Sequence, residues 1–387
     1  MKRCWRISAA MALLGLMASN SAWAQSVAAP AKLPPQMAWT AFDTGSAGFN
    51  VLVAIGAAFN KAYNIDLRVL PAGNDTARLA PLRTGKAMLT STGMGLYYAQ
   101  EGALEFGVKE WGPQPVSIVL TSLDCNAATI GVAGDIGVKE VKDLKGKRIA
   151  SVVGAPGLNI NPIAILAFAG LTRDDVKIVE FSSYGAMWKG VLNNEVDVGF
   201  AVTVSPQVRE VAASPRGIVW PQTPAADKEG WARLLKVAPY FQPHKTTCGV
   251  GISADKPLEL PVFPYPILGV YNSQPDELIY SIARALIDQY PAYKDAAPGA
   301  AGLDVKNQTV NWVMPYHPGA VRALKEAGLW TDAAQKHNDA LFRRQEVLAA
   351  AWKAYGASNP PDDKFNDGWR KARAEALTKA GFDPVFN

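Results

Sequence analysis

IDLRVLPAGNDTARLAPLRTGKAMLTS, residues 65–91, has a counterpart later in the chain in VKIVEFSSYGAMWKGVLNNEVDVGFAV, residues 176–202. Each segment begins with a short apolar strand and passes through a small polar turn, GND or SSY, into a helix whose apolar residues recur at a spacing near 3.6. Each segment then ends in another apolar strand. The chain therefore repeats one β-α-β unit. Alternating strands and helices predict α/β lobes with doubly wound, parallel sheets that carry helices on both faces.

A glycine-rich turn precedes each of these units. TGSAGFN, residues 44–50, lies between two apolar runs, and GAPGLN, residues 154–159, follows a strand over Arg148–Val153 and begins a helix that reaches about Leu171. The free N–H groups at the start of a helix can hold an anion, whereas a glycine turn can also serve packing alone. The turn recurs at the matching place in both halves, which favours two anion-binding turns over two packing turns.

These turns do not match the known nucleotide-phosphate loops. A P-loop ends in Gly-Lys-Ser or Gly-Lys-Thr, and the first turn has no lysine before Lys61. The dinucleotide fingerprint G-x-G-x-x-G is also missing, because the first glycines are Gly45, Gly48 and Gly56. Ligands of such sheets bind outside the carboxyl ends of the strands. Since every one of these turns follows a strand, we expect them all at a binding edge.

The first 24 residues have the pattern of a secretory signal peptide. Lys2, Arg3 and Arg6 form a basic start, an apolar core follows, and Ala22-Trp23-Ala24 is a small-x-small cleavage site. We therefore expect export to the periplasm with cleavage after Ala24, which would leave 363 of the 387 residues. Residues 25–36 are rich in alanine and proline and are predicted to be a flexible leader.

Composition limits the partners and the cysteine chemistry. The net charge is +5, of which the predicted signal peptide supplies three basic residues, so the mature chain is near balance and we expect no nucleic-acid partner. Cys125 and Cys248 remain after cleavage, and in an oxidising compartment they either pair or stay as small buried residues. Helices predicted at Thr331–Tyr355 and Phe365–Ala380 are expected to cover a core.

No catalytic or metal-binding motif stands out. The three histidines, His244, His317 and His337, are far apart in sequence, and H-E-x-x-H, C-x-x-C and G-x-S-x-G are all missing. Asp43 lies beside the first glycine turn, but no spacing ties it to a second carboxylate. We therefore predict a binding protein without a cofactor or a metal, and not an enzyme.

Six segments in order resemble the TAXI family of TRAP-transporter substrate-binding proteins. They span about Ala38 to Trp330 and read TGSAGFN, LPAGNDTARLAPLRTGKAML, VKDLKGKRIASVVGAPG, AGLTRDDVKIVEFSSY, YPILGVYNSQPDELIYSIARALI and MPYHPGA. The resemblance implies a type II periplasmic binding protein that closes two lobes on a small carboxylate, such as glutamate or a related organic anion. It also implies delivery of that anion to a TRAP membrane permease driven by an ion gradient.

On this interpretation the chain is a monomeric "Venus flytrap" with a two-segment hinge. Lobe I comprises residues 37–124 and 231–387, with extra C-terminal helices, and lobe II comprises residues 125–230, so the chain crosses near Cys125 and near Gly230. Arg78 is a candidate counter-charge for the anion, or alternatively a solvated residue on the second turn of its helix. The expected ligand contacts are Thr44, Gly45, Ser46, Phe49, Asn74, Thr76, Thr92, Gly157, Leu158, Asn159, Tyr184 and Trp188.

Two departures from the family pattern bear on the ligand. The family commonly has Tyr-Tyr-Pro after the first glycine turn, where this chain has Val51-Leu52-Val53, and the second turn lacks the usual Ser and Thr hydroxyls. Both changes favour a more apolar or larger carboxylate. Two alternatives stay open: a periplasmic binding protein that serves a sensor or another transporter, and a secreted enzyme with scattered catalytic residues.

Overall fold

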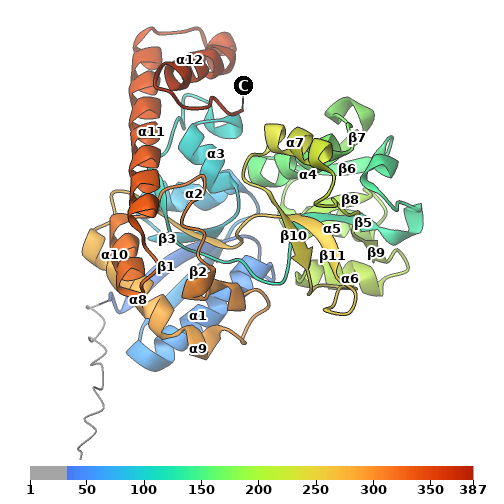
Figure 1. The fold of residues 1–387 in the computed structure, drawn as a ribbon, viewed down its shortest axis with the longest axis horizontal. Coiled ribbons are helices and arrows are strands. Elements are labelled where there is room, and N and C mark those ends of the chain that lie inside the picture. The colour runs from blue at the N-terminus through green and yellow to red at the C-terminus, as the bar shows by residue number, and fades with distance from the viewer. Residues whose placement is uncertain (1–32, 387) are drawn as a thin grey trace, which may run out of the picture.

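The computed structural model describes residues 33–386 as two α/β lobes that lie side by side (Figure 1). The predicted signal peptide and most of the predicted leader lie outside these residues. Lobe I contains the strands β1 (Gln36–Ala41), β2 (Asp66–Pro71), β3 (Leu89–Thr92), β4 (Val116–Thr121) and β12 (Ile267–Tyr271), and the helices α1 (Ala47–Tyr63), α2 (Asp75–Arg83), α3 (Gly95–Glu101), α8 (Asp276–Asp288), α9 (Tyr290–Tyr293) and α10 (Pro318–Glu326).

Lobe II is built from the middle of the chain, and two long helices follow lobe I at its end. Lobe II contains β5 (Ala128–Ala133), β6 (Arg148–Val152), α4 (Pro156–Phe168), β7 (Lys177–Phe181), α5 (Tyr184–Leu192), β8 (Val198–Val202), α6 (Pro206–Ala213), β9 (Ile218–Val219), α7 (Lys228–Val237), β10 (Gln242–Thr246) and β11 (Leu258–Val262). The C-terminal extension contains α11 (Asp332–Ala357) and α12 (Phe365–Lys379).

The two lobes share one sheet topology. The strand order is β2-β1-β3-β12-β4 in lobe I and β7-β6-β8-β5-β9 in lobe II. In both sheets the first three strands in this order are parallel to one another and are connected as βαβ units. The fourth position holds an antiparallel strand, β12 or β5, and each of these is the first strand after the chain changes lobe. This arrangement confirms the predicted type II periplasmic binding protein fold.

The second crossing lies later than predicted from the sequence. We expected it near Gly230, but Trp231 and Leu234 of α7 are buried, α7 packs along α4, and the β10–β11 ribbon contacts β5 of lobe II. Residues 231–262 therefore pack with lobe II, and the chain returns to lobe I between β11 and β12. A sequence gives no signal for this boundary, because an amphipathic helix does not specify which of two neighbouring cores it covers.

A disulfide ties the first crossing to the β10–β11 ribbon. Cys125 lies between β4 and β5, Cys248 lies between β10 and β11, and the two sulfurs are bonded with their Cα atoms 5.3 Å apart. The backbone supports the same contact, since the N–H groups of Thr247 and Cys248 donate to the carbonyl of Cys125 at 2.9 and 3.2 Å. Cys248 thus belongs to the segment that packs with lobe II, not to lobe I as we expected from the sequence.

Replacing both cysteines, Cys125→Ser with Cys248→Ser, should lower the free energy of unfolding by about 2–5 kcal/mol, because the bridge closes a long loop in the unfolded chain. Guanidinium denaturation measures this change. A reducing agent should destabilise the parent protein to a similar extent and leave the double variant unaffected. Two free thiols found in the unreduced, denatured parent chain would contradict the bridge.

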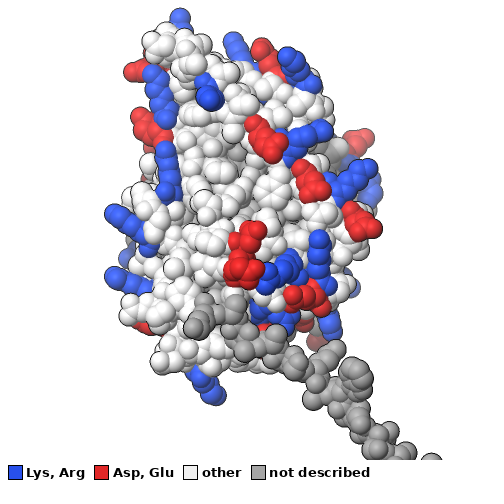
Figure 2. Space-filling view, turned by 90° about the vertical axis from the view of Figure 1, so that its left-hand side faces the viewer, with Lys and Arg blue, Asp and Glu red and all other residues white. Residues whose placement is uncertain are grey.

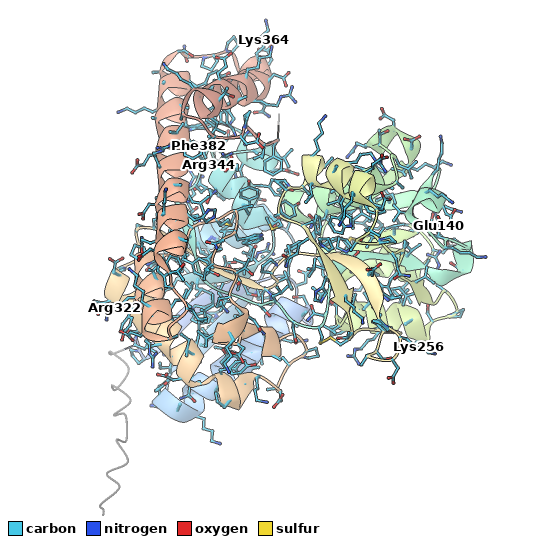
Figure 3. All side chains as sticks on the ribbon, viewed as in Figure 1. Glu140, Lys256, Arg322, Arg344, Lys364 and Phe382 are labelled. Atoms are coloured by element: carbon cyan, nitrogen blue, oxygen red, sulfur yellow. A yellow bond between two sulfur atoms is a disulfide. The ribbon has the colours of Figure 1, made fainter. Side chains whose placement is uncertain are left out.

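The C-terminal extension is anchored on lobe I by a buried ionic cluster. Helix α11 runs along one side of lobe I, and α12 lies over α3 (Figure 1). Both carboxylate oxygens of Glu101 accept from Arg344, at 2.7 Å each, and Arg373 donates to one of them at 2.9 Å. Arg344 lies beside Phe382 on the inner side of the extension (Figure 3). Burial alone would raise the pKa of Glu101, but the two arginines outweigh it and hold that pKa below its ordinary value.

Glu101→Gln should therefore lower the free energy of unfolding at neutral pH by about 3–5 kcal/mol, since it leaves two buried guanidinium groups without their anion. A carboxylate whose folded-state pKa is depressed stabilises the protein above its unfolded pKa, and this contribution is lost as the pH falls through the folded pKa. The difference between parent and variant should thus shrink below about pH 4.5, the ordinary value for this group. Urea denaturation at several pH values tests both statements.

Lys109→Ala is the matched control for this variant. It breaks the pair between Lys109 and Asp362, whose side chains are 44 % and 87 % exposed. An exposed pair of this kind contributes less than about 1 kcal/mol. Equal losses for the two variants would contradict the view that the buried cluster anchors the extension.

Charges on the outer face are mixed. Figure 2 shows acidic and basic side chains interspersed over the side of the molecule on which α8, α10 and α11 lie.

Among residues 33–386, no helix is both long and apolar enough to cross a membrane.

Candidate ligand-binding site

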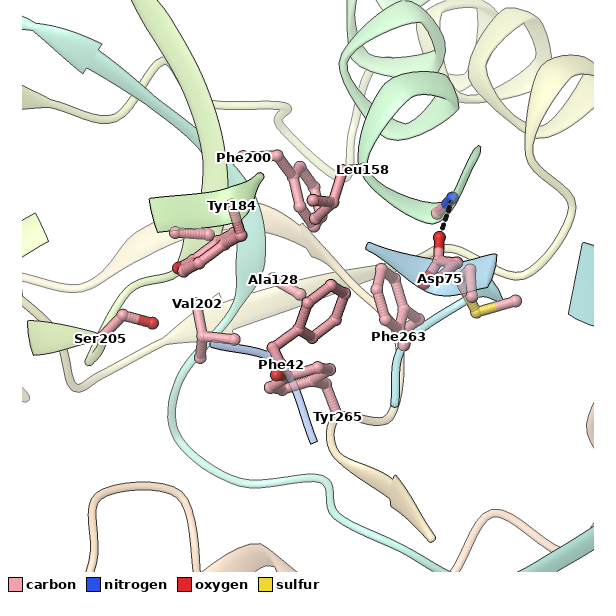
Figure 4. Close-up of a pocket in the computed structure, with 14 residues that line it drawn as sticks. Phe42, Asp75, Ala128, Leu158, Tyr184, Phe200, Val202, Ser205, Phe263 and Tyr265 are labelled. Carbon is pink, nitrogen blue, oxygen red and sulfur yellow. Dashed lines mark hydrogen bonds between the residues drawn. The ribbon is translucent and has the colours of Figure 1, made fainter. Parts of the chain in front are cut away.

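Helices from the two lobes meet end to end in the cleft. The N-terminus of α2 in lobe I faces the turn before α4 in lobe II, and the carbonyl of Gly154 accepts from the N–H groups of Asp75 and Thr76 at 3.1 and 3.2 Å. In return, Oδ2 of Asp75 accepts from the N–H of Gly157 at 2.8 Å, as the dashed line in Figure 4 shows. The anion-binding turn predicted at residues 154–159 therefore holds a carboxylate, and that carboxylate belongs to the protein itself.

A second contact between the lobes occurs at the start of α5, where both acceptors come from lobe I. Oδ2 of Asp43 accepts from the N–H of Gly185 at 2.8 Å, and the carbonyl of Gly73 accepts from the N–H of Tyr184 at 3.0 Å. Asp43 is thus more than a strand-end residue, because it caps a helix of the other lobe. Helix N-terminal N–H groups that face another lobe need such acceptors.

Arg78 is the buried cation next to this interface. Its side chain is fully buried, its Nη2 donates to Oδ1 of Asp75 and, at 2.9 Å, to Oγ1 of Thr92, and its Cζ lies 3.4 Å from the centre of the Phe42 ring. Among the described residues, its Nε and Nη1 have no hydrogen-bond partner. The alternative of a solvated arginine is therefore wrong.

Burial changes the titration of this pair. It raises the pKa of Asp75 above its ordinary value, although the Arg78 charge and the Gly157 amide act in the opposite direction. It also lowers the pKa of Arg78, against the attraction of Asp75. Both shifts express the cost of placing a charged pair in a dry interface.

An apolar cavity lies beside these contacts. In Figure 4, Phe42 and Tyr265 from the lobe I side face Leu158 and Phe200 of lobe II. The space open to the centres of water molecules is about 30 Å³, which holds on the order of one or two waters. Ligand sites are commonly about 300–1,000 Å³, so this cavity is much smaller than a typical ligand site. The lining consists of Phe42, Asp75, Gly93, Met94, Ala128, Gly157, Leu158, Tyr184, Phe200, Ala201, Val202, Ser205, Phe263 and Tyr265.

Three of the predicted contacts line this cavity: Gly157, Leu158 and Tyr184. Thr92 lies one step behind it, through Arg78. The remaining predicted residues of lobe I do not line the cavity. Ser46 caps α1 by accepting from the N–H of Phe49 at 3.2 Å, Asn74 caps α2 by accepting from Ala77 at 2.8 Å, Thr76 donates to Asn74, and Thr44 and Gly45 lie in the turn before α1.

Two predicted contacts in lobe II have structural roles. The side-chain amide of Asn159 bonds both the N–H and the carbonyl of Val152, at 2.7 and 2.9 Å, so it holds α4 onto β6. Trp188 is buried under the sheet, where added methyl groups at Gly131 and Gly199 would touch its ring at 2.9 and 3.1 Å. At the start of α4 the N–H of Gly157 donates to a carboxylate, whereas the N–H groups of Leu158 and Asn159 donate to the carbonyl of Ala155.

Sequence reasoning missed most of the apolar lining. Phe42 directly follows β1, before the first glycine turn, so its position after a strand end was a usable signal. Phe263 and Tyr265 lie in the second crossing, and Phe200 lies in a buried strand, where nothing marks an aromatic residue as part of a cleft. Burial raises the pKa of Tyr265 to about 12 and that of Tyr184 further, so both hydroxyls stay protonated and can donate to a ligand.

A two-lobed fold with a hinge and a cavity between the lobes defines the class of substrate-binding proteins. This chain belongs to the NMT1-like family, whose model matches residues 42–328, about three quarters of its length.

The chain is similar to several solved structures, each at low sequence identity. The alkanesulfonate-binding protein SsuA from Xanthomonas axonopodis pv. citri, bound to MOPS, is 14 % identical, with 86 % of this chain and 96 % of that chain covered and a TM-score of 0.42. The periplasmic aliphatic sulphonate binding protein SsuA from Escherichia coli is 15 % identical, with coverage of 79 % and 83 % and a TM-score of 0.41. PhnD1 from Prochlorococcus marinus, in complex with methylphosphonate, is 13 % identical, with coverage of 66 % and 85 % and a TM-score of 0.40.

Gly157→Ala tests the contact between the lobes. A Cβ at residue 157 would lie 2.6 Å from the backbone N of Gly95 and 3.0 Å from Oδ2 of Asp75, both in lobe I, so the lobes could not close fully. The reason is this close approach and not a positive φ, which in this turn belongs to Gly154. We expect a larger radius of gyration by small-angle scattering and at least a tenfold loss of ligand affinity.

Gly356→Ala is the control, since a Cβ there meets no atom within 4 Å. It should leave both the radius of gyration and the affinity unchanged. A Gly157→Ala protein as compact as the parent would contradict the closed contact.

Proposed function

We propose that this chain is a periplasmic substrate-binding protein that captures a small carboxylate with an apolar body between its lobes and hands it to a transporter. The observation that carries the proposal is the N–H of Gly157, which holds a carboxylate at the start of α4 and at the edge of an apolar interlobe cavity. A helix N-terminus favours anions because its N–H groups are free and its dipole end is positive. The type II fold supplies the two crossings about which such lobes can move.

The cavity supports an apolar body for the ligand. Aromatic and aliphatic side chains make up most of its lining, and Asp75 is its charged member. The hydroxyls of Tyr184 and Tyr265 are buried donors that suit an anion or a neutral oxygen. A ligand with one carboxylate and an aromatic or branched body therefore fits this lining better than glutamate, whose second carboxylate would need a further counter-charge.

For the transporter we propose a TRAP permease. The support is the resemblance of the six ordered segments to the TAXI family, together with the export signal predicted for the first 24 residues. The genes next to the coding sequence separate this role from that of a sensor or another transporter. Turnover of an organic-acid pool by the purified protein would instead indicate a secreted enzyme.

A thermal-shift screen tests the ligand class. Acetate, isovalerate, phenylacetate and glutamate should be compared, and the apolar-bodied acids should stabilise the protein most. A ligand at 100 times its Kd adds about 2.7 kcal/mol to the free energy of unfolding. If no carboxylate in a broad panel raises the melting temperature, the proposed function is wrong.

Phe200→Ala links the screen to the cavity. Losing about 50 Å² of apolar contact at about 25 cal/mol per Å² costs about 1.3 kcal/mol, or roughly tenfold in affinity. Phenylacetate should lose this affinity while acetate, which has no body to contact the ring, should not. Val53→Ala, at an exposed position of α1, is the control and should change neither.

A further inference from the structure

We propose that Asp75 is an internal competitor for the ligand: in the closed protein its carboxylate occupies the place that the carboxylate of the ligand takes on binding. The inference rests on the proposed function and adds to it the anion subsite, formed by the N–H of Gly157 and the guanidinium of Arg78.

The surroundings of Asp75 have the shape of a carboxylate cradle. Its two oxygens are divided between the lobes, with Oδ2 on the N–H of Gly157 and Oδ1 on Nη2 of Arg78. Glycines form two walls of the cradle, since a Cβ at Gly95 or at Gly157 would lie 2.2 or 3.0 Å from these oxygens. Any side chain at either position would fill the space that the carboxylate needs.

Arg78 has more hydrogen-bond donors in this subsite than the carboxylate of Asp75 uses. Asp75 lies three residues before Arg78 on the same helix and contacts one guanidinium nitrogen, while Nε and Nη1 are buried without a partner among residues 33–386. A buried donor without a partner loses its hydrogen bond to water and gains nothing in return, which is unfavourable. A free carboxylate is not tethered to α2 and can take two guanidinium N–H groups at once, which is the stronger arrangement.

Asp43 provides an internal comparison. It also reaches from lobe I to a helix N-terminus of lobe II, and its distance to the N–H of Gly185 is the same 2.8 Å. No arginine or lysine among the described residues forms an ion pair with it. Asp43 therefore makes the contact between the lobes without an ion pair to a guanidinium group.

Displacement of Asp75 has a predictable effect on affinity. Because Asp75 is tethered to the protein, its carboxylate competes for the subsite at an effective concentration of about millimolar or more. When the subsite is free for only a fraction of the time, the Kd of the ligand rises by the inverse of that fraction. The same tether refills the subsite when the ligand leaves, so Arg78 keeps a counter-charge after release.

The experiment compares Asp75→Asn with Asp43→Asn by titration calorimetry, with phenylacetate and acetate as probes. We expect Asp75→Asn to bind both acids at least tenfold more tightly than the parent protein, and Asp43→Asn to bind them no more tightly. The inference is overturned if Asp75→Asn binds no tighter than the parent, or if both variants tighten equally, which would indicate only looser closure. If neither acid binds the parent or any variant, the inference is overturned, and if the broad carboxylate panel also gives no binder, the proposed function fails as well.

Chemical rescue keeps the inference testable if Asp75→Asn does not fold well. Asp75→Ala leaves the subsite open, so acetate should raise the melting temperature of this variant saturably and more than that of the parent. The double variant Asp75→Ala with Arg78→Met removes the buried charge, and acetate should have no such effect on it. Equal responses of the two variants to acetate would overturn the role of Arg78 and with it the subsite.

Discussion

Unpaired N–H groups at helix N-termini are the constraint on which the contact between the lobes depends. In both sheets the helices α2, α4 and α5 follow parallel strands, so their N-termini open at the same edge, and closure buries that edge. Buried N–H groups need acceptors. The protein supplies them across the cleft, with the carboxylates of Asp43 and Asp75 in one direction and the carbonyl of Gly154 in the other.

This solution places charge where the surroundings are otherwise apolar. Phe42 covers the guanidinium of Arg78 and also lines the cavity, so the same ring separates the ion pair from the apolar body of a ligand. Removing two opposite charges from water is costly even when they meet. A pair of this kind, beside a helix start and with unused donors, is better explained by exchange with a ligand than by stability alone.

The buried ions near the C-terminus have a different surrounding. Glu101, the last residue of α3, is held by Arg344 and Arg373 from the C-terminal extension. These ion pairs join helices that are distant in sequence. No residue of the extension lines the apolar cavity.

Local pattern was enough to predict the β-α-β units, the two glycine turns and the helices of the extension, because periodicity and turn chemistry act over a few residues. It was not enough to place the second crossing, to pair Cys125 with Cys248, or to find that Asn159 and Trp188 serve the lobe II core. Phe263 and Tyr265 escaped notice for the same reason, since a chain crossing has no periodic signal.

The sequence by itself was enough to predict an anion-binding turn in lobe II at residues 154–159, since a glycine turn before a helix leaves N–H groups free. Only the tertiary structure decided that the N–H of Gly157 donates to a carboxylate, and that this carboxylate, Asp75, comes with Arg78 from the other lobe. The reason is that these groups come from two β-α-β units about 80 residues apart. Their contact depends on how the two lobes close, and no local spacing encodes it.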